Sequence, residues 1–205
     1  LHLCHHNLET INNTTSMTTT SDTLLAEVCM AAKYEGQSIR DYYTIHEHTN
    51  RDTKSQLCTV LARSFADIGD IVRGRDLYLG NPEEIEQRKQ LENKLKVIFG
   101  KIHKEVTNGK NRLALQARYN GDKENYYKLR EDWWYANRGT AWKALTCSKE
   151  LDNSSYFRVT CSDSEHSGTF SQANKYCRCN GDKPNADKPN IDPPTYFDYV
   201  PQFLR

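Results

Sequence analysis

Seven cysteines in a strongly polar chain of 205 residues are the feature that most constrains its folding. They are Cys4, Cys29, Cys58, Cys147, Cys161, Cys177 and Cys179. Only 37% of the residues are hydrophobic and the mean hydropathy is -0.85, so the core must be thin. Chains of this kind are usually stabilised by disulfides in an oxidising compartment. The cysteines are scattered and form no paired CxxC pattern, which favours disulfides over a zinc site.

The odd number of cysteines indicates either a free thiol or a partner outside this chain. The chain lacks an initiator methionine, and "YVPQFLR" reads like the start of another helix, so we expect a fragment. Cys4 is closest to an end and is the best candidate for the unpartnered thiol. No signal peptide or apolar run of membrane-spanning length occurs, so we expect any membrane anchor to lie in other parts of the protein.

Hydrophobic spacing predicts long helices near residues 56–73, 82–107 and 122–147. The first has an apolar face of Leu57, Leu61, Phe65, Ile68 and Val72 at intervals of three and four. The second begins with Asn81 as N-cap, Pro82 at the first helical position and Glu84 completing a capping box. The third contains the aromatic segment "DWWYANRGTAW", which we expect to pack in the core.

A further helix is expected from Asp22 as N-cap, with a break at Gly36. "YFRVTC" is predicted to be a short extended segment, and the Pro-rich and Asn-rich stretches to be loops. No run of alternating strands is present. The fold class is therefore mainly α.

Candidate metal and catalytic groups are few. Cys4, His5 and His6 are adjacent, and His46 and His48 flank Glu47, but they lack the i, i+4 histidine spacing that places two ligands on one helical face. Cys161, Cys177 and Cys179 could supply three thiolates, although two separate disulfides fit an oxidising compartment better.

The acidic pairs Glu83/Glu84 and Glu131/Asp132 are typical of helix first turns and solvated faces. No cysteine is identified as an activated nucleophile. We predict no catalytic residue, no cofactor and no metal, and hence a chain that is not an enzyme.

A local basic segment stands out in a chain whose net charge is only +1. It contains Lys101, His103, Lys104, Lys110, Arg112 and Arg118, of which Lys101, Lys104, Lys110 and Arg112 are the candidates for binding a glycan. Cations are favoured at a helix C-terminus, so a solvated helix end is one interpretation. The other is a binding site for a sulfated glycan, because clustered Lys and Arg are typical of heparin-type patches. The near-neutral chain gives no indication of a nucleic-acid partner.

Asn12, Asn13 and Asn153 head N-x-S/T sequons, and the sequence leaves their glycosylation open.

Several blocks, in order, cover nearly the whole chain and resemble those of one known family. They are "LHLCHHNLE", "LLAEVCMAAKYEGQSI", "LCTVLARSFADIGDIVRGRDLYLG", "REDWWYANRGTAWKALTC", "YFRVTC" and "PPTYFDYVPQFLR". Together they resemble a Duffy-binding-like domain of the alpha class, from the variant erythrocyte membrane proteins of the malaria parasite.

The resemblance implies a disulfide-stapled helical bundle with long loops. It implies an N-terminal subdomain over residues 1–50 and a central helical-bundle subdomain over 51–205, truncated at its C-terminal end. It also implies an adhesion module on the infected erythrocyte surface that binds a host cell-surface receptor or sulfated glycan. The alternatives are an antigenically variable scaffold whose neighbouring domains bind the receptor and, from another class, a metal-dependent or thiol enzyme.

The resemblance further implies a disulfide between Cys58 and Cys161 that bridges the central subdomain. A closed loop of about a hundred residues stabilises the fold by roughly 4 to 5 kcal/mol in the chain-entropy model, as an upper figure. The remaining cysteines other than Cys4 allow three pairings, which the sequence does not distinguish. Cys177 and Cys179 are too close to favour pairing with each other.

Overall fold

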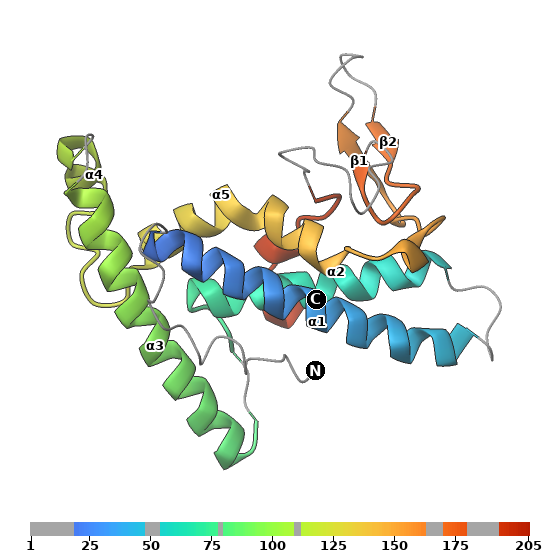
Figure 1. Ribbon diagram of the computed structural model, residues 1–205, viewed down its shortest axis with the longest axis horizontal. Helices are drawn as coiled ribbons and strands as arrows, with labels where there is room; N and C mark the ends of the chain where they lie inside the picture. Colours follow the sequence, from blue (N-terminus) through green and yellow to red (C-terminus); the bar gives the residue numbers. More distant parts are fainter. Residues whose placement is uncertain (1–18, 48–53, 78–79, 109–111, 163–169, 180–192) are drawn as a thin grey trace.

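Helices make up most of the part of the chain that the computed structural model describes. The described residues are 19–47, 54–77, 80–108, 112–162, 170–179 and 193–205. The helices α1 (Thr20–Glu47), α2 (Lys54–Arg73) and α5 (Tyr127–Leu145) pack together as a bundle, while α3 (Pro82–Thr107) and α4 (Arg112–Arg118) form an arm at one end (Figure 1). The predicted mainly α fold is confirmed. Within these segments, no helix has the length and apolar content needed to cross a bilayer.

The helix α1 begins two residues before the predicted cap. The Thr19 hydroxyl accepts a hydrogen bond from the Asp22 backbone N–H at 3.2 Å, and the Asp22 carboxylate accepts one from the Thr19 backbone N–H at 3.2 Å. These reciprocal bonds form a capping box in which Asp22 is the third helical residue. The prediction of Asp22 as N-cap is therefore wrong.

Gly36 does not break α1, which runs without interruption through it. A Cβ atom at this position would lie only 2.1 Å from the Leu145 carbonyl oxygen of α5. The glycine is therefore explained by the close crossing of α1 and α5, and the predicted break is wrong.

The predictions for α2 and α3 are confirmed, with α2 starting two residues early and α3 matching its predicted bounds. At the start of α3 the Asn81 side chain accepts from the Glu84 backbone N–H at 2.9 Å, and the Glu84 carboxylate accepts from the Asn81 N–H at 3.0 Å. This is the capping box that the sequence predicts.

The third predicted helix is shorter than expected at both ends. Tyr126 has a left-handed backbone with φ 54°, which ends any helical path from residue 122, so α5 begins at Tyr127 and stops at Leu145. The Asp122 carboxylate instead accepts from the Leu129 backbone N–H at 3.0 Å. The short helix α4 was not predicted.

Aromatic side chains fill the centre of the bundle. The Phe65 ring of α2 lies 5.2 Å from the rings of both Trp134 and Trp142 of α5. These two indoles are fully buried, and each indole N–H has an acceptor: the Asp198 carboxylate at 2.9 Å for Trp134 and the Cys177 carbonyl at 3.1 Å for Trp142. The expected core packing of the aromatic segment is confirmed for these residues.

The C-terminal segment is held on the bundle by a buried ion pair. Asp198 accepts two hydrogen bonds from the Arg138 guanidinium, both at 2.8 Å, and its side chain is fully buried. The Arg73 guanidinium donates to the Asp198 backbone carbonyl, and Arg205 pairs with Asp67 at 3.0 Å. Residues 193–205 thereby join α2 to α5.

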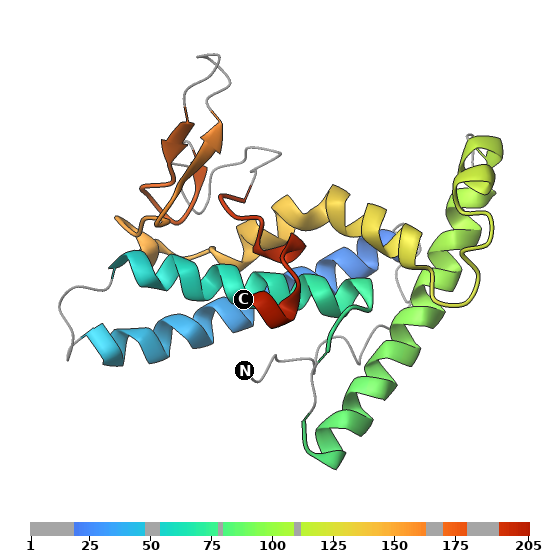
Figure 2. The same ribbon diagram turned by 180° about the vertical axis from the view of Figure 1, so that it is seen from behind.

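A small antiparallel sheet of β1 (Val159–Ser162) and β2 (Phe170–Gln172) rises from the other end of the bundle (Figure 2). The extended segment predicted at "YFRVTC" is confirmed for its last three residues, which lie in β1. The Thr160 hydroxyl donates to the Pro194 carbonyl at 2.6 Å and so links the sheet to the C-terminal segment. The division of the chain near residue 50 into two subdomains stays a prediction.

Two disulfides bind this sheet region together, and they differ from the predicted pairing. Cys58 is bonded to Cys177, and Cys161 to Cys179, with Cα–Cα distances of 5.5 and 5.4 Å. The predicted Cys58–Cys161 disulfide is therefore wrong. Cys29 and Cys147 take part in neither of the two disulfides, and Cys4 lies outside the described residues.

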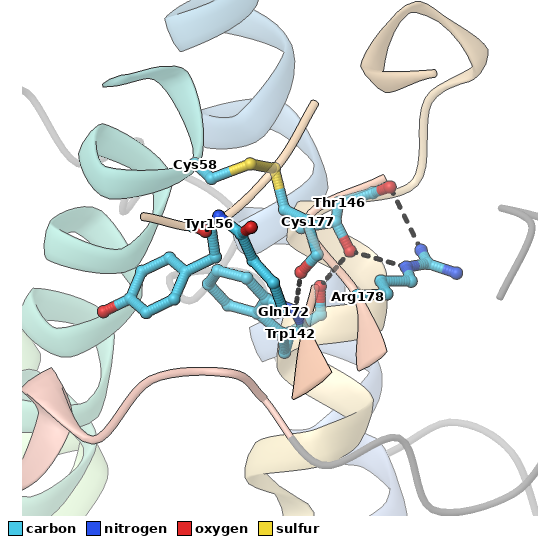
Figure 3. Close-up of a disulfide and its surroundings, with 7 residues drawn as sticks. All are labelled: Cys58, Trp142, Thr146, Tyr156, Gln172, Cys177 and Arg178. Carbon is cyan, nitrogen blue, oxygen red and sulfur yellow. Dashed lines mark hydrogen bonds between the residues drawn. A yellow bond between two sulfur atoms is a disulfide. The ribbon is translucent and has the colours of Figure 1, made fainter. Parts of the chain in front are cut away.

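The physical reason for this pairing is the buried Arg178, which lies between Cys177 and Cys179. Its guanidinium donates to the Lys143 carbonyl and the Thr146 hydroxyl, both at 2.8 Å, and to the Thr146 carbonyl at 3.0 Å. These bonds fix the turn at the C-terminal end of α5, where Cys177 faces the head of α2 (Figure 3). Cys179, two residues further on, lies beside β1 and is bonded there to Cys161.

We predict that the two disulfides contribute unequally to the stability. In the chain-entropy model, a separation of 119 residues corresponds to about 5 kcal/mol and one of 18 residues to about 3 kcal/mol, both as upper figures. The double variant Cys58→Ala/Cys177→Ala should therefore lower the free energy of unfolding more than Cys161→Ala/Cys179→Ala. Urea denaturation measures both, with the surface variant Lys89→Ala as the control. Equal losses for the two double variants would contradict the prediction.

Candidate functional site

The outer face of α3 carries a row of lysines. Lys94, Lys101 and Lys104 are exposed, with the exposed Val97 between them, and we call these four residues the α3 stripe. Their spacing of three and four residues places them on one face of the helix. From Lys94 to Lys104 the stripe extends for about 15 Å along the helix axis. No ion pair among the described residues involves Lys101 or Lys104.

The apolar face of α3 fixes the direction of the stripe. Leu91, Leu95, Ile98 and Ile102 are buried, and the Phe99 ring makes an edge-on contact with Trp133 at 6.0 Å between centroids. Because these side chains face the protein, the lysines at the intervening positions face the solvent.

The structure brings together two of the four predicted glycan-binding residues. Lys101 and Lys104 lie one turn apart in the α3 stripe. Arg112 is the first residue of α4, which returns along α3 and is held there by a hydrogen bond from the Gln116 side chain to the Thr107 carbonyl at 3.1 Å. Lys110 lies outside the described residues. Binding of a glycan by this set stays a prediction.

Lys94 is a member of the stripe that the sequence prediction missed. It lies seven residues before Lys101, which is two helical turns, so the same face was readable from the sequence. Lys94 lies before the dense basic segment that begins at Lys101 and on which the prediction rests.

Arg118, at the end of the same basic segment, is engaged within the protein. Its guanidinium donates two hydrogen bonds to the Asp132 carboxylate, both at 2.6 Å, and Asp132 also accepts from the Tyr119 hydroxyl at 2.9 Å. The hydrogen bonds from Arg118 lower the pKa of Asp132, while the carboxylate raises the pKa of Arg118. This arginine therefore ties α4 to α5, and its charge is balanced by Asp132.

The other candidate groups have structural partners. Cys161, Cys177 and Cys179 are all in disulfides, so they supply no thiolates to a metal. Glu131 pairs with Arg73 at 3.3 Å and with Arg75 at 2.9 Å.

The candidate histidine ligands are only partly within the described residues. His46 lies in α1, while Cys4, His5, His6 and His48 lie outside the described part of the chain. Among the described residues, no cluster of three or more His, Cys, Asp or Glu side chains could hold a metal ion.

Of the three sequons, only Asn153 is described, and it is exposed with φ 66°.

Comparison with known proteins identifies relatives along the whole chain. The sequence profile of the Duffy binding domain matches residues 1–205. The crystal structure of the NTS-DBL1(alpha-1) domain of Plasmodium falciparum membrane protein 1 (PfEMP1), varO strain, is 40% identical with a TM-score of 0.71. The match covers 99% of this chain and 40% of that structure's chain. No curated protein is significantly similar to the chain.

Two further structures show how much longer the relatives are. The NTS-DBL1-alpha and CIDR-gamma double domain of the varO PfEMP1 has the same identity and TM-score, with 99% of this chain and 25% of its own length matched. An ICAM-1-binding DBLbeta domain, from the PfEMP1 IT4var13, is 29% identical with a TM-score of 0.56. That match covers 89% of this chain and 34% of the relative. The chain thus spans between a quarter and two fifths of these structures.

We predict that Asp132→Asn makes the stability less sensitive to acid. Because the folded protein has a lowered Asp132 pKa, its contribution is present above the ordinary carboxyl pKa of about 3.9. That contribution is lost as the pH falls through the lowered pKa. Urea unfolding between about pH 5 and 2 should therefore show a shallower decline in the variant. Asp152→Asn, at an exposed carboxylate for which no ion pair is described, is the control, and identical acid profiles of wild type and Asp132→Asn would refute the assignment.

Proposed function

Because this chain belongs to the Duffy binding domain family, we propose that it is an adhesion module that binds a receptor on host cells, carried by a variant antigen on the surface of infected erythrocytes. The observation that carries this proposal is the match over residues 1–205 together with PfEMP1 relatives at 40% identity. One relative, the IT4var13 DBLbeta domain, is described as ICAM-1-binding. That description supports a cell-surface receptor in general and does not identify the receptor of this chain.

We also propose that the α3 stripe contacts an anionic, sulfated part of the receptor glycan. The supporting observation is that Lys94, Lys101 and Lys104 lie on one exposed face of an arm that projects from the bundle (Figure 1). Neighbouring ammonium groups attract a polyanion by Coulomb interactions and release its counterions on binding. We keep Lys110 and Arg112, which follow α3 in the sequence, as candidate contacts on sequence grounds alone.

A second function is supported by the extent of the relatives. This chain spans 40% of the NTS-DBL1(alpha-1) structure, and in this second function the receptor site lies in the other parts of the whole protein. The chain would then act as an antigenically variable scaffold whose neighbours bind the receptor.

Binding of the recombinant chain to intact red cells and endothelial cells, with and without heparin, tests the proposal. Heparin should compete for the bound chain, and the double variant Lys101→Glu/Lys104→Glu should bind heparin more weakly. The slope of log K against log salt should fall by about two, one for each lost contact, as for other polyanions. The matched control is Lys33→Glu/Lys89→Glu, which reverses two exposed lysines outside the stripe.

The outcomes separate the two functions. Unchanged heparin affinity and salt slope in Lys101→Glu/Lys104→Glu would overturn the α3 stripe as the glycan site. Absence of binding to either cell type, by a chain whose helical circular dichroism is intact, would favour the scaffold function over the adhesion module.

A further inference from the structure

An Asn-Gly pair lies in the connection between α4 and α5 (Figure 1). Asn120 is followed by Gly121, and both residues are exposed. They occupy the middle of a turn that is closed by a hydrogen bond from the Asp122 N–H to the Tyr119 carbonyl at 3.1 Å. Gly121 has φ 85°, the left-handed backbone that the third position of a type II turn requires. The turn therefore explains why a residue without a Cβ follows Asn120.

The backbone nitrogen of Gly121 is accessible to a neighbouring group. Its N–H makes no hydrogen bond within the part of the chain that the structure describes. Apart from the glycine's neighbours in the chain, no heavy atom lies within 4 Å of the position that a Cβ at residue 121 would occupy. Because neither a hydrogen-bond acceptor nor a packed side chain holds this nitrogen, it can approach the side-chain amide of the preceding asparagine.

We infer that Asn120 is a site of spontaneous deamidation, with water as the co-reactant. The Gly121 nitrogen attacks Cγ of Asn120 and forms a new C–N bond. The bond from Cγ to the side-chain nitrogen breaks, and that nitrogen leaves as ammonia with the proton of the Gly121 N–H. Water then opens the resulting succinimide ring at either carbonyl carbon and yields aspartate or isoaspartate. The net reaction converts an amide and water into a carboxylic acid and ammonia, and no group is oxidised or reduced.

Asn153, which precedes Ser154, is the matched comparison within the same chain. The Ser154 N–H donates to the Leu151 carbonyl at 2.9 Å, and the Ser154 carbonyl accepts from the Cys177 N–H at 3.1 Å. Ser154 is also buried, with 5% of its surface exposed. Its nitrogen is therefore engaged and enclosed. Attack on Asn153 requires local unfolding around a disulfide-bonded residue, whereas attack on Asn120 requires the opening of an exposed turn.

Conversion of Asn120 changes the charge and the backbone of the connection that holds α4 to α5. It adds a negative charge two residues after Arg118, whose guanidinium is bonded to the Asp132 carboxylate. Isoaspartate also adds one methylene to the backbone between Tyr119 and Asp122, which the turn hydrogen bond joins. The modification therefore acts on the contacts between α4 and α5, and it does not depend on the proposed adhesion function.

Peptide mapping by mass spectrometry tests this inference. The purified chain is incubated at physiological temperature and pH, and samples are digested with trypsin at mildly acidic pH, where the digest itself adds little deamidation. The peptide 119–123, which contains Asn120, should gain the mass difference between an amide and an acid and separate into aspartate and isoaspartate forms. The peptide 150–158, which contains Asn153, should convert roughly tenfold more slowly, because the hydrogen bond of the Ser154 N–H must open first. Asn120→Gln, whose longer side chain would need a less favourable six-membered ring, is the control and should stay unmodified.

Incubation in urea separates the effect of the fold from that of the dipeptide. Unfolding frees the Ser154 N–H, so the ratio of the rate at Asn120 to the rate at Asn153 should be smaller in urea than in the folded protein. The peptide 105–110, which contains the pair Asn108–Gly109, shows that the conditions permit deamidation. An unmodified peptide 119–123 beside a converted peptide 105–110, equal rates at Asn120 and Asn153 in the folded protein, or an unchanged ratio in urea would overturn the inference.

Discussion

The Cys58–Cys177 disulfide is the constraint on which the arrangement of this chain depends. It joins the head of α2 to a turn 119 residues later, and the same turn carries Cys179, which is bonded to β1. The fully buried Arg178 between them bonds the end of α5. Three elements that are distant in sequence are thus held at one end of a bundle whose hydrophobic content alone is modest.

The buried Asp198 holds the C-terminal segment on the bundle. It is buried with Arg138 and accepts the Trp134 indole N–H, so the C-terminal segment lies across α5 and α2. Breaking a buried ion pair by removing one partner costs about 3–5 kcal/mol, because the other charge stays buried without compensation. The segment is consequently part of the framework from which the arm of α3 and α4 projects (Figure 1).

This arrangement separates the rigid framework from the proposed contact surface. The bundle is fixed by disulfides and buried ion pairs, while the arm presents the α3 stripe outward.

The sequence by itself determined what depends on neighbouring residues: the bounds of α2 and α3, the capping box at Asn81 and the lysine face of α3, because helical spacing and capping act within a few residues. The family resemblance gave the fold but not the partner of Cys58. Only the tertiary structure decided that pairing, because the buried hydrogen bonds of Arg178 place Cys177 beside α2. Likewise the reason for Gly36 arises where α1 and α5 cross, and no local pattern encodes such a meeting of helices distant in sequence.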